Sequence, residues 1–395
     1  MANQARNAAP DFDQYLIDIR RHLHQYPELS NEEFETTIAI RRWLEEAGVR
    51  IADYGLATGV IAEIGKPAGE GPLIAIRADI DALPVQEETG LPFASRIEGK
   101  MHACGHDFHT ASIIGAAVLL KQREHELNGT VRFLFQPAEE KAQGALKVIE
   151  SGALEGVQAV FGMHNKPNLP VGVVGVKEGP LMAAADGFIV EVDGVGTHAA
   201  VPEAGNDPVV TAAHIVTALQ SIVSRNVGTL QSAVVSVTKL HSGTTWNVVP
   251  DKAVLEGTIR TFEEDVRQKV LARFEEVVLG VASAFGTTAR VRWIQGPPPV
   301  HNDKQLAVVA EEAAERAGLT AVVPVPSPAG EDFSFYQKQV PGVFVFMGTA
   351  GPQEWHHPAF DLDERALPLS AGYFTELALL ALEQLKETAA GRTNG

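Results

Sequence analysis

The sequence predicts an α/β protein in which a small α+β domain interrupts a larger, discontinuous domain. Its 395 residues allow two or three folding units at about 150 residues per domain. Strand and helix signals alternate over residues 1–185 and return over 296–395, which favours a layered α/β architecture. Between them, residues 186–295 follow the order β-α-β-β-α-β. That order is typical of a ferredoxin-like domain, so we expect an insertion at 186–295.

The first segment opens with helices. Phe12, Leu16, Ile19 and Leu23 recur at helical spacing and predict the first helix. A capping box is expected from Ser30 and Glu33 before a second helix, which Gly48 should end. Short apolar runs then predict strands of one sheet, with helices between them. These strands are expected at 59–64, 73–78, 131–135 and 159–163, and the helices at 106–123 and 142–151.

The same patterns predict the strands and helices of the inserted segment and of the final segment. The strands of the insertion are expected at 188–192, 233–240, 253–261 and 289–293, and its helices at 208–225 and 263–285. A loop with three consecutive prolines, 296–303, leads back to the larger domain. There we expect a strand at 343–347 and a helix at 365–386.

Composition narrows the classes of function. Hydrophobic residues make up 45% of the chain, and the formal net charge is -18, so we expect a globular protein that repels phosphate backbones and anionic lipid. Nucleic acid and membranes are therefore not expected as partners. No apolar run approaches the roughly 20 residues that span a bilayer. The first residues lack the pattern of a signal peptide, and the single cysteine, Cys104, cannot form an intrachain disulfide. We expect a cytoplasmic location.

The segment 102–109, with the sequence HACGHDFH, concentrates metal-binding chemistry before a predicted helix. Thiolate and imidazole are good ligands for zinc and similar divalent metals, and a nearby carboxylate can orient the ring nitrogen that does not bind metal. The alternative is a helix start with a small buried cysteine and solvent-facing histidines. Taken singly, His102 and His109 fit a structural role better than ligation.

Two adjacent carboxylates, Glu139 and Glu140, directly follow the predicted strand at 131–135. Metal-dependent hydrolysis needs one carboxylate as a ligand and a second one to move protons. An exposed pair of acids on the surface is the alternative.

The other candidates share this placement after strands. His164 ends one predicted strand, and the doublet His356-His357 lies beyond another. Asp79 and Asp81 follow a third, where they could orient a ligand or simply form a surface turn. Segments that follow strands meet at one edge of an open parallel sheet, and sites form there.

These motifs together resemble the M20 metallopeptidase family, in its amidohydrolase branch of hippurate hydrolases, N-acyl-amino-acid deacetylases and auxin-conjugate hydrolases. The resemblance runs from about Tyr15 to Leu385. It is carried by RRHLH at 20–24, RADIDALP at 77–84, HACGHD at 102–107, FQPAEE at 135–140, THAAVPEAGNDP at 197–208, WNVVPD at 246–251, GEDF at 330–333 and HHPAFDLDE at 356–364.

The resemblance implies a discontinuous zinc-peptidase-like catalytic domain and an inserted lid or dimerisation domain. It also implies two divalent metal ions per subunit, Glu139 as the general base, and a homodimer or larger homo-oligomer formed through the insertion. The implied metal ligands are Cys104, His106, Glu140, His164 and His356. The doublet leaves His357 as an alternative, although the family pattern favours His356.

In the insertion, the resemblance implies that His198 acts in catalysis and that Asn247 and Arg260 bind substrate. An arginine suits a substrate carboxylate because its planar fork donates two parallel hydrogen bonds. A packing or solvent-facing histidine, a turn residue and a surface ion pair are the respective alternatives.

The expected function is metal-dependent hydrolysis of the amide in small N-acyl amino acids, such as N-acetyl or N-benzoyl amino acids, by a metal-bound hydroxide. The ligand set suits zinc, manganese, cobalt or nickel. A cysteine-nucleophile amidase that uses Cys104 is a second hypothesis. A non-catalytic metal- or peptide-binding relative is a third, and the Glu139-Glu140 pair counts against it because a binding module needs no unligated base.

Overall fold

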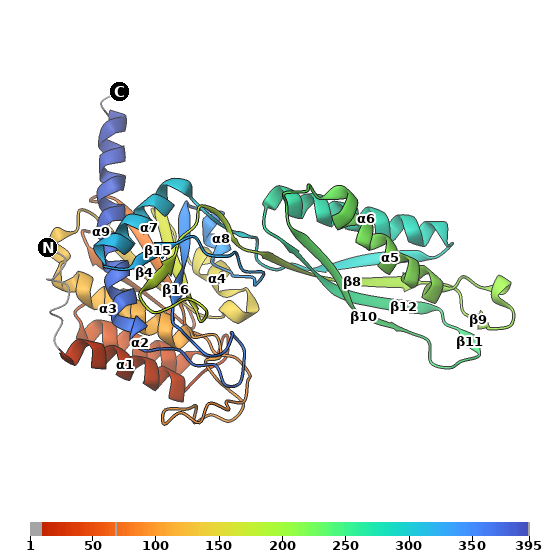
Figure 1. The fold of residues 1–395 in the computed structure, drawn as a ribbon, viewed down its shortest axis with the longest axis horizontal. Helices are drawn as coiled ribbons and strands as arrows, with labels where there is room; N and C mark the ends of the chain where they lie inside the picture. The colour runs from red at the N-terminus through yellow and green to blue at the C-terminus, as the bar shows by residue number, and fades with distance from the viewer. Residues whose placement is uncertain (1–9, 68, 394–395) are drawn as a thin grey trace. The chain divides into compact units, whose positions relative to one another are not determined.

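The computed structural model describes residues 10–67 and 69–393 and divides into two units (Figure 1). Unit 2 comprises Pro180–Val300 and Pro326–Glu331, and the other described residues form unit 1. The chain passes between the units within β7 (Gly179–Met182), within β14 (Val300–Asn302), and again on either side of Pro326–Glu331. Each unit has its own apolar core.

An eight-stranded mixed sheet forms the centre of unit 1. In spatial order its strands are β1 (Arg50–Ala52), β2 (Val60–Gly65), β4 (Thr130–Gln136), β3 (Leu73–Asp79), β5 (Ala159–Lys166), β16 (Gly342–Gly348), β6 (Val173–Gly175) and β15 (Thr320–Val322). The expected strands of the first segment do lie in one sheet. The sheet is mixed, because β2 pairs antiparallel to both β1 and β4, and β16 pairs antiparallel to β6.

The four central strands β4, β3, β5 and β16 are mutually parallel, and this subset positions the site. Parallel strands present their carboxyl ends at one edge of the sheet, where ligand and catalytic groups collect. His164 lies near the end of β5, and the segments that follow β4, β3 and β16 carry Glu139, Asp81 and His356. These residues are distant in sequence, but the topology brings their segments to the same edge.

Helices cover this sheet. The helices of unit 1 are α1 (Pro10–Gln25), α2 (Phe34–Glu46), α3 (His106–Gln122), α4 (Gly144–Glu150), α7 (Lys304–Arg316), α8 (Ser334–Gln337) and α9 (Ala366–Thr393), with short 3-10 turns η2 (Glu124–Glu126) and η3 (Glu139–Lys141). Helix α3 is buried from His106 through Ala117 and packs against α1 and α9. Its first turn is thereby held rigidly at the edge of the sheet.

The predicted capping box is wrong. Helix α2 begins at Phe34, and Glu33 makes no side-chain cap. The Ser30 hydroxyl instead donates to Asp81 Oδ2 (2.6 Å), while the backbone N–H groups of Glu35 and Thr36 donate to the Glu28 carboxylate. The Glu28 carboxylate therefore caps the start of the helix in place of the S-x-x-E pattern. The Ser30 hydroxyl instead bonds to Asp81, a residue of the candidate site. The end of the helix follows the prediction, because Gly48 takes the left-handed conformation with φ 74°.

Unit 2 has the ferredoxin-like arrangement that the sequence predicts. Its antiparallel sheet has the order β10-β12-β8-β13, and both helices pack against its core. The elements are β8 (Ala184–Asp193), α5 (Pro208–Asn226), β10 (Ala233–Ser242), β12 (Lys252–Thr261), α6 (Glu264–Ala284) and β13 (Thr288–Ile294). A short turn η4 (Pro202–Ala204) and a two-stranded ribbon, β9 (Thr197–His198) with β11 (Val248–Val249), extend from one end of it (Figure 1).

No helix among the described residues is both long enough and apolar enough to cross a lipid bilayer.

Candidate metal centre

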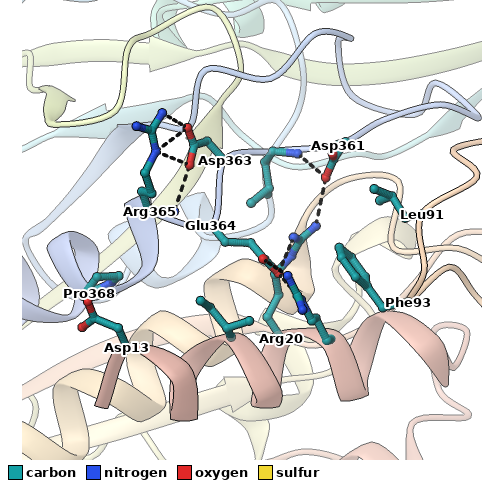
Figure 2. Close-up of a pocket in the computed structure, with 12 residues that line it drawn as sticks. Asp13, Arg20, Leu91, Phe93, Asp361, Asp363, Glu364, Arg365 and Pro368 are labelled. Atoms are coloured by element: carbon teal, nitrogen blue, oxygen red, sulfur yellow. Dashed lines mark hydrogen bonds and ion pairs between the residues drawn. The ribbon is translucent and has the colours of Figure 1, made fainter. Parts of the chain in front are cut away.

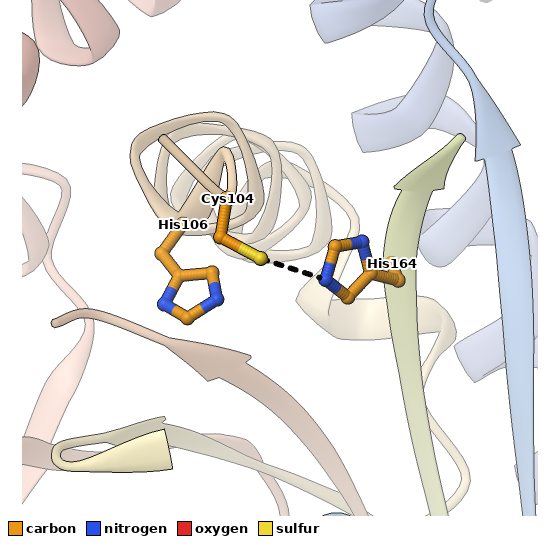
Figure 3. A group of neighbouring side chains, drawn as sticks. All are labelled: Cys104, His106 and His164. Carbon is orange, nitrogen blue, oxygen red and sulfur yellow. Dashed lines mark hydrogen bonds between the residues drawn. The ribbon is translucent and has the colours of Figure 1, made fainter. Parts of the chain in front are cut away.

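Cys104, His106 and His164 come together at the carboxyl edge of the sheet (Figure 3). Cys104 Sγ lies 3.4 Å from His164 Nε2, and the potential ligand atoms of the three residues lie within 4.8 Å of one another. Gly105 makes the tight turn between the first two possible, because its φ of 83° is one that side-chain-bearing residues rarely adopt. All three side chains are buried.

Glu140 connects this group to His356. A second cluster with atoms within the same 4.8 Å limit consists of Cys104, Glu140 and His356, and a third consists of His106, Glu139 and Glu140. Glu140 Oε1 lies 3.8 Å from His106 Nε2 and 3.6 Å from His356 Nε2. The structure thus places all five predicted ligands and Glu139 in overlapping clusters.

Of the doublet, His356 is the residue in this cluster. His356 has a positive φ of 66°, which turns its ring toward Glu140. His357 Nδ1 instead accepts a hydrogen bond from the backbone N–H of Ala359 (3.0 Å). The geometry therefore supports His356 rather than His357.

Aspartates behind the imidazoles fix their tautomers. His106 Nδ1 donates to Asp81 Oδ1 (3.2 Å), which leaves Nε2 facing Glu140. His109 is held differently, because its Nδ1 contacts Asp79 Oδ1 (2.6 Å) and its Nε2 accepts from the backbone N–H of Asn165 (2.8 Å). Both nitrogens of His109 are thus engaged, and it supports the site without a free ligand atom.

The donor atoms fit divalent cations. His106 Nε2 and Glu140 Oε1 are buried, and neither has a hydrogen-bond partner among the described residues. Native structures rarely leave buried polar atoms unsatisfied, so a pair of them 3.8 Å apart indicates an absent partner for both. Sulfur, imidazole and carboxylate are together a ligand set for zinc and other first-row metals.

The electrostatics of the cluster also favour a cation. Burial and then the charges of Glu140 and Glu139 raise the pKa of the Cys104 thiol well above its ordinary value. Burial lowers the pKa of His106, but Asp79 and Asp81 outweigh it and raise that pKa to about 10. Burial raises the pKa of Glu140 to about 7. Burial and the neighbouring carboxylates together thus favour the protonated forms of these groups, and a divalent cation would compensate the negative charge that those protons neutralise.

The cysteine-nucleophile hypothesis finds no support in this geometry. A reactive cysteine needs a lowered pKa and an adjacent protonatable base. Here the pKa of Cys104 is raised, and burial together with His109 lowers the pKa of His164 well below its usual range. This environment therefore disfavours a pair of thiolate and imidazolium.

The remaining predicted residues lie in unit 2, at two separate places. His198 pairs with Val248 in the ribbon of β9 and β11, next to Asn247, whose backbone carbonyl accepts from Ala199 (3.1 Å). Arg260 lies near the opposite end of β12, where its Nε donates to the Pro328 carbonyl (3.2 Å). Lys252, beside the ribbon, and Arg260 are eight residue steps apart along β12, which is about 27 Å at 3.3–3.4 Å per residue.

A separate pocket of about 510 Å³ lies beside α1 in unit 1 (Figure 2). Arg20 and Arg21 line it and both pair with Glu364, and their guanidinium groups lie over the ring of Phe93. None of the candidate ligands lines this pocket. Its connection to the centre is indirect: Arg20 Nε donates to Asp107 Oδ2 (3.1 Å), the residue after His106.

Sequence reasoning missed several supporting residues. Asn165 and Trp355 contact the cluster directly, and Arg20, His24 and Asp332 contact residues beside it. The available signal is the position of Asn165, directly after the candidate ligand His164 and near the end of β5. Trp355 likewise directly precedes His356.

Comparisons with known proteins identify the family of this chain and its relatives. The family model described as peptidase family M20/M25/M40 matches residues 75–380. N-acetylcysteine deacetylase of Bacillus subtilis is 57% identical over 376 residues, which cover 95% of this chain and 99% of the relative. An IAA-amino acid hydrolase of Arabidopsis thaliana is 39% identical, with 97% of this chain and 89% of the relative covered. A crystal structure of a Bacillus subtilis protein, described as a dinuclear metal binding peptidase from the M20 family, matches with a TM-score of 0.86 and 53% identity over 95% of this chain and 99% of that one.

Proposed function

Because the chain belongs to peptidase family M20/M25/M40 and is a metal-dependent amidohydrolase, we propose that it cleaves the amide bond of small N-acyl amino acids. N-acetylcysteine is the first candidate substrate, since two relatives at 57% and 55% identity carry the names N-acetylcysteine deacetylase and N-acetyl-L-cysteine deacetylase. Other N-acetyl and N-benzoyl amino acids and indole-acyl conjugates are further candidates. The hydrolase named for IAA-amino acids supports the last of these.

The observation that carries this proposal is a pair of buried atoms, His106 Nε2 and Glu140 Oε1, that lack hydrogen-bond partners among the described residues and lie beside Cys104 and Glu139. We assign two divalent cations to this centre. Their proposed ligands are Cys104, His106, Glu140, His164 and His356. The cations supply Lewis acidity, which polarises the amide carbonyl and makes a water molecule more acidic.

Glu139 would handle the protons. It follows the parallel strand β4 in the 3-10 turn η3, directly before the ligand Glu140, and its Oε1 accepts the backbone N–H of Asp332 at 3.3 Å. We propose that Glu139 takes a proton from the attacking water and delivers it to the nitrogen of the leaving amine as the C–N bond breaks. The products are then a carboxylic acid and a free amino acid.

The residues of unit 2 would complete the reaction. A guanidinium such as that of Arg260 suits the substrate carboxylate. We further propose that His198 stabilises the oxyanion in the active site of a second subunit, with Asn247 beside it. The separation of about 27 Å along β12 supports this division, because one small substrate cannot reach both ends of the strand.

A dimer would form through the outer strand of unit 2. In the described structure β10 pairs with β12 on one side only, and its ten residues include the exposed Val234 and Leu240. A long, partly apolar edge strand invites pairing with another strand. A second copy of β10 would continue the sheet, and sedimentation of wild-type protein and Leu240→Lys tests this. A cytoplasmic location would suit the free thiol of Cys104.

The test of the reaction is a hydrolysis panel on chelated protein. Zinc, manganese, cobalt or nickel is added back singly, and release of the free amino acid is measured from N-acetyl, N-benzoyl and indole-acyl substrates. We expect activity to vanish on chelation, to return with metal, and to be highest on N-acetylcysteine or a close analogue. Undiminished hydrolysis by fully metal-free protein would contradict the proposal.

A further inference from the structure

Asn165 connects the candidate metal centre to its surroundings. It directly follows His164 in β5, and its side chain is completely buried. Its backbone N–H donates to His109 Nε2 (2.8 Å), and its backbone carbonyl accepts from His164 Nδ1 (2.9 Å). Its side-chain Nδ2 donates to the backbone carbonyl of Cys104 (2.6 Å). One residue thus holds groups from two of the proposed ligands.

The orientation of the Asn165 amide is fixed by its partners. The Cys104 carbonyl can only accept a hydrogen bond, so Nδ2 must face it. The indole Nε1 of Trp355 can only donate, so Oδ1, 3.2 Å away, must face that side. A flipped amide would break both bonds. A carboxamide therefore meets both demands at this position.

The amide also shapes the turn that presents Cys104 and His106. A Cβ atom added to Gly105, which lies between these residues, would approach Asn165 Nδ2 to 2.4 Å. The amide thus packs directly on the bare Cα of Gly105. The hydrogen bond to the Cys104 carbonyl then fixes the peptide that carries the thiol.

His164 is held on two sides. Its Nδ1 donates to the Asn165 carbonyl, which leaves the Nε2 lone pair facing Cys104 Sγ at 3.4 Å. Its ring packs on the indole of Trp355 with centroids 4.3 Å apart, and Trp355 Nε1 bonds to the same carbonyl (3.2 Å). The backbone carbonyl of Asn165 thus sets the tautomer, and the Asn165 side chain helps to hold the indole on which the ring packs, through Oδ1 and Trp355 Nε1.

We infer that Asn165 is a positioning residue that holds Cys104 and His164 as one preformed ligand pair. This inference rests on the proposed function in one respect, since it takes these two residues as ligands of the same centre. Outer partners of metal ligands matter because they fix ligand orientation, and losing one typically lowers metal affinity about 10–100-fold.

The test is a cobalt titration of full-length protein stripped of metal. Cobalt bound by a thiolate gives a charge-transfer absorption that reports the Cys104 ligand directly, independent of activity. We expect Asn165→Ala to lower cobalt affinity about 10–100-fold and to weaken or shift this band. Asn165→Asp keeps the size and the acceptor but loses the amide donor, so it should act in the same direction. It also keeps the test open if the alanine variant does not fold.

Asn302→Ala is the matched control. Asn302 is also buried in unit 1, and its side chain bonds to the Phe344 carbonyl (2.8 Å) and N–H (2.8 Å) away from the centre. It should lose thermal stability while keeping wild-type cobalt affinity and absorption. Trp355→Phe keeps the ring on His164 but removes the indole donor, and we expect it to lower affinity less than Asn165→Ala does.

The outcomes distinguish the positioning role of Asn165 from the assignment of the metal ligands. Wild-type affinity and absorption in Asn165→Ala and Asn165→Asp would overturn the positioning role and leave the proposed ligands intact. Equal losses of affinity in Asn165→Ala and Asn302→Ala would also overturn it, because a general loss of packing would then explain both. Absence of the thiolate band in wild-type protein would overturn the ligand assignment itself, and the positioning role with it.

Discussion

The two units hold their candidate residues in opposite ways. In unit 1, His106 and His164 are buried. His106 bonds to Asp81, which is 25 residues away, and His164 bonds to the carbonyl of the next residue. In unit 2, His198 and Asn247 are on a two-stranded ribbon, and their side chains bond to residues only two positions away. His198 is exposed.

This difference follows from how each region is built. Parallel strands bring distant segments to one edge, so the centre in unit 1 is assembled and oriented before substrate arrives. A two-residue ribbon carries few such constraints. We therefore expect a substitution in unit 1 to change metal binding or the chemical step within its own subunit. A substitution in the ribbon should change catalysis only where the ribbon contacts an active site.

The largest expected effect tests the chemistry of unit 1. Glu139→Gln keeps the size of the side chain but removes the proton acceptor, so we expect kcat to fall about 10²–10⁴-fold. Metal content should stay near the wild-type value, because Glu139 is proposed as a base rather than a ligand. Kinetics and metal analysis on the same preparation measure both.

Glu150→Gln, at the exposed end of α4, is the control and should behave as wild type. A Glu139→Gln enzyme with wild-type kcat would remove Glu139 from the mechanism.

The next effect tests the ribbon of unit 2. Loss of one oxyanion donor typically costs about 10²–10³-fold in kcat, so we expect a loss of that size for His198→Ala with unchanged metal affinity. His214→Ala is the control, because His214 is an exposed histidine of the same unit on α5, bonded to the Val210 carbonyl (2.9 Å).

Subunit mixing tells whether His198 acts on its own subunit or on another. His198→Ala and Glu139→Gln should each be inactive alone. A mixed dimer has one site with both groups intact if His198 acts in the partner's site, and activity should then return. Verified heterodimers that stay inactive would rule out action in trans, and a fully active His198→Ala would rule out any catalytic role.

Cys104→Ala should produce a smaller change, and one in metal binding. Removing a soft ligand should lower metal affinity at least by the 10–100-fold typical for loss of an outer partner, and excess metal should restore activity only in part. The metal affinity of Cys104→Ser, which keeps a weaker oxygen donor, should lie between those of the wild type and Cys104→Ala. Isothermal titration with zinc measures this. Unchanged affinity in an inactive Cys104→Ala, together with a trapped thioester in the wild type, would instead establish a cysteine nucleophile.

The sequence predicts much of the fold, the five proposed ligands and Glu139, because these signals are local. Apolar runs mark the strands, and polar residues such as Glu140 and His164 stand directly after them. The failures depend on long-range partners. Ser30 looks like a helix cap, but its hydroxyl meets Asp81 51 residues away. Asn165 and Trp355 show their importance only once β5 and the segment before His356 lie together.

Arg20 and His24 are the same kind of case, since both bond to Asp107 from α1. Local pattern places these polar residues on a helix whose neighbours Leu16, Ile19 and Leu23 enter the core. It does not show that the polar side chains are buried as well. Their burial is explained only by a carboxylate that arrives on α3.

The smallest expected effect concerns stability and its dependence on pH, and it sharpens the contrast between the units. His24 is buried, with Nδ1 2.8 Å from Asp107 Oδ2 and Nε2 3.3 Å from Glu87 Oε1. Burial alone would lower its pKa, but the hydrogen bonds and charge of these carboxylates outweigh burial and raise the pKa to about 9. The unfolded value is near 6.5.

Since the folded pKa is the higher one, the stabilisation from protonated His24 is fully present below pH 6.5 and disappears as pH rises through about 9. The full difference amounts to at most about 3 kcal/mol. Hydrogen-exchange protection measures it by region. Protection of α1 and α3 should fall between pH 6.5 and 9 while that of α5 and α6 stays constant. His24→Gln cannot titrate and should make this fall smaller, and the part that remains belongs to His106, whose pKa is raised in the same direction to about 10. An equal fall in both units, or a fall of unchanged size in His24→Gln, would show that His24 does not contribute to the pH dependence of unit 1.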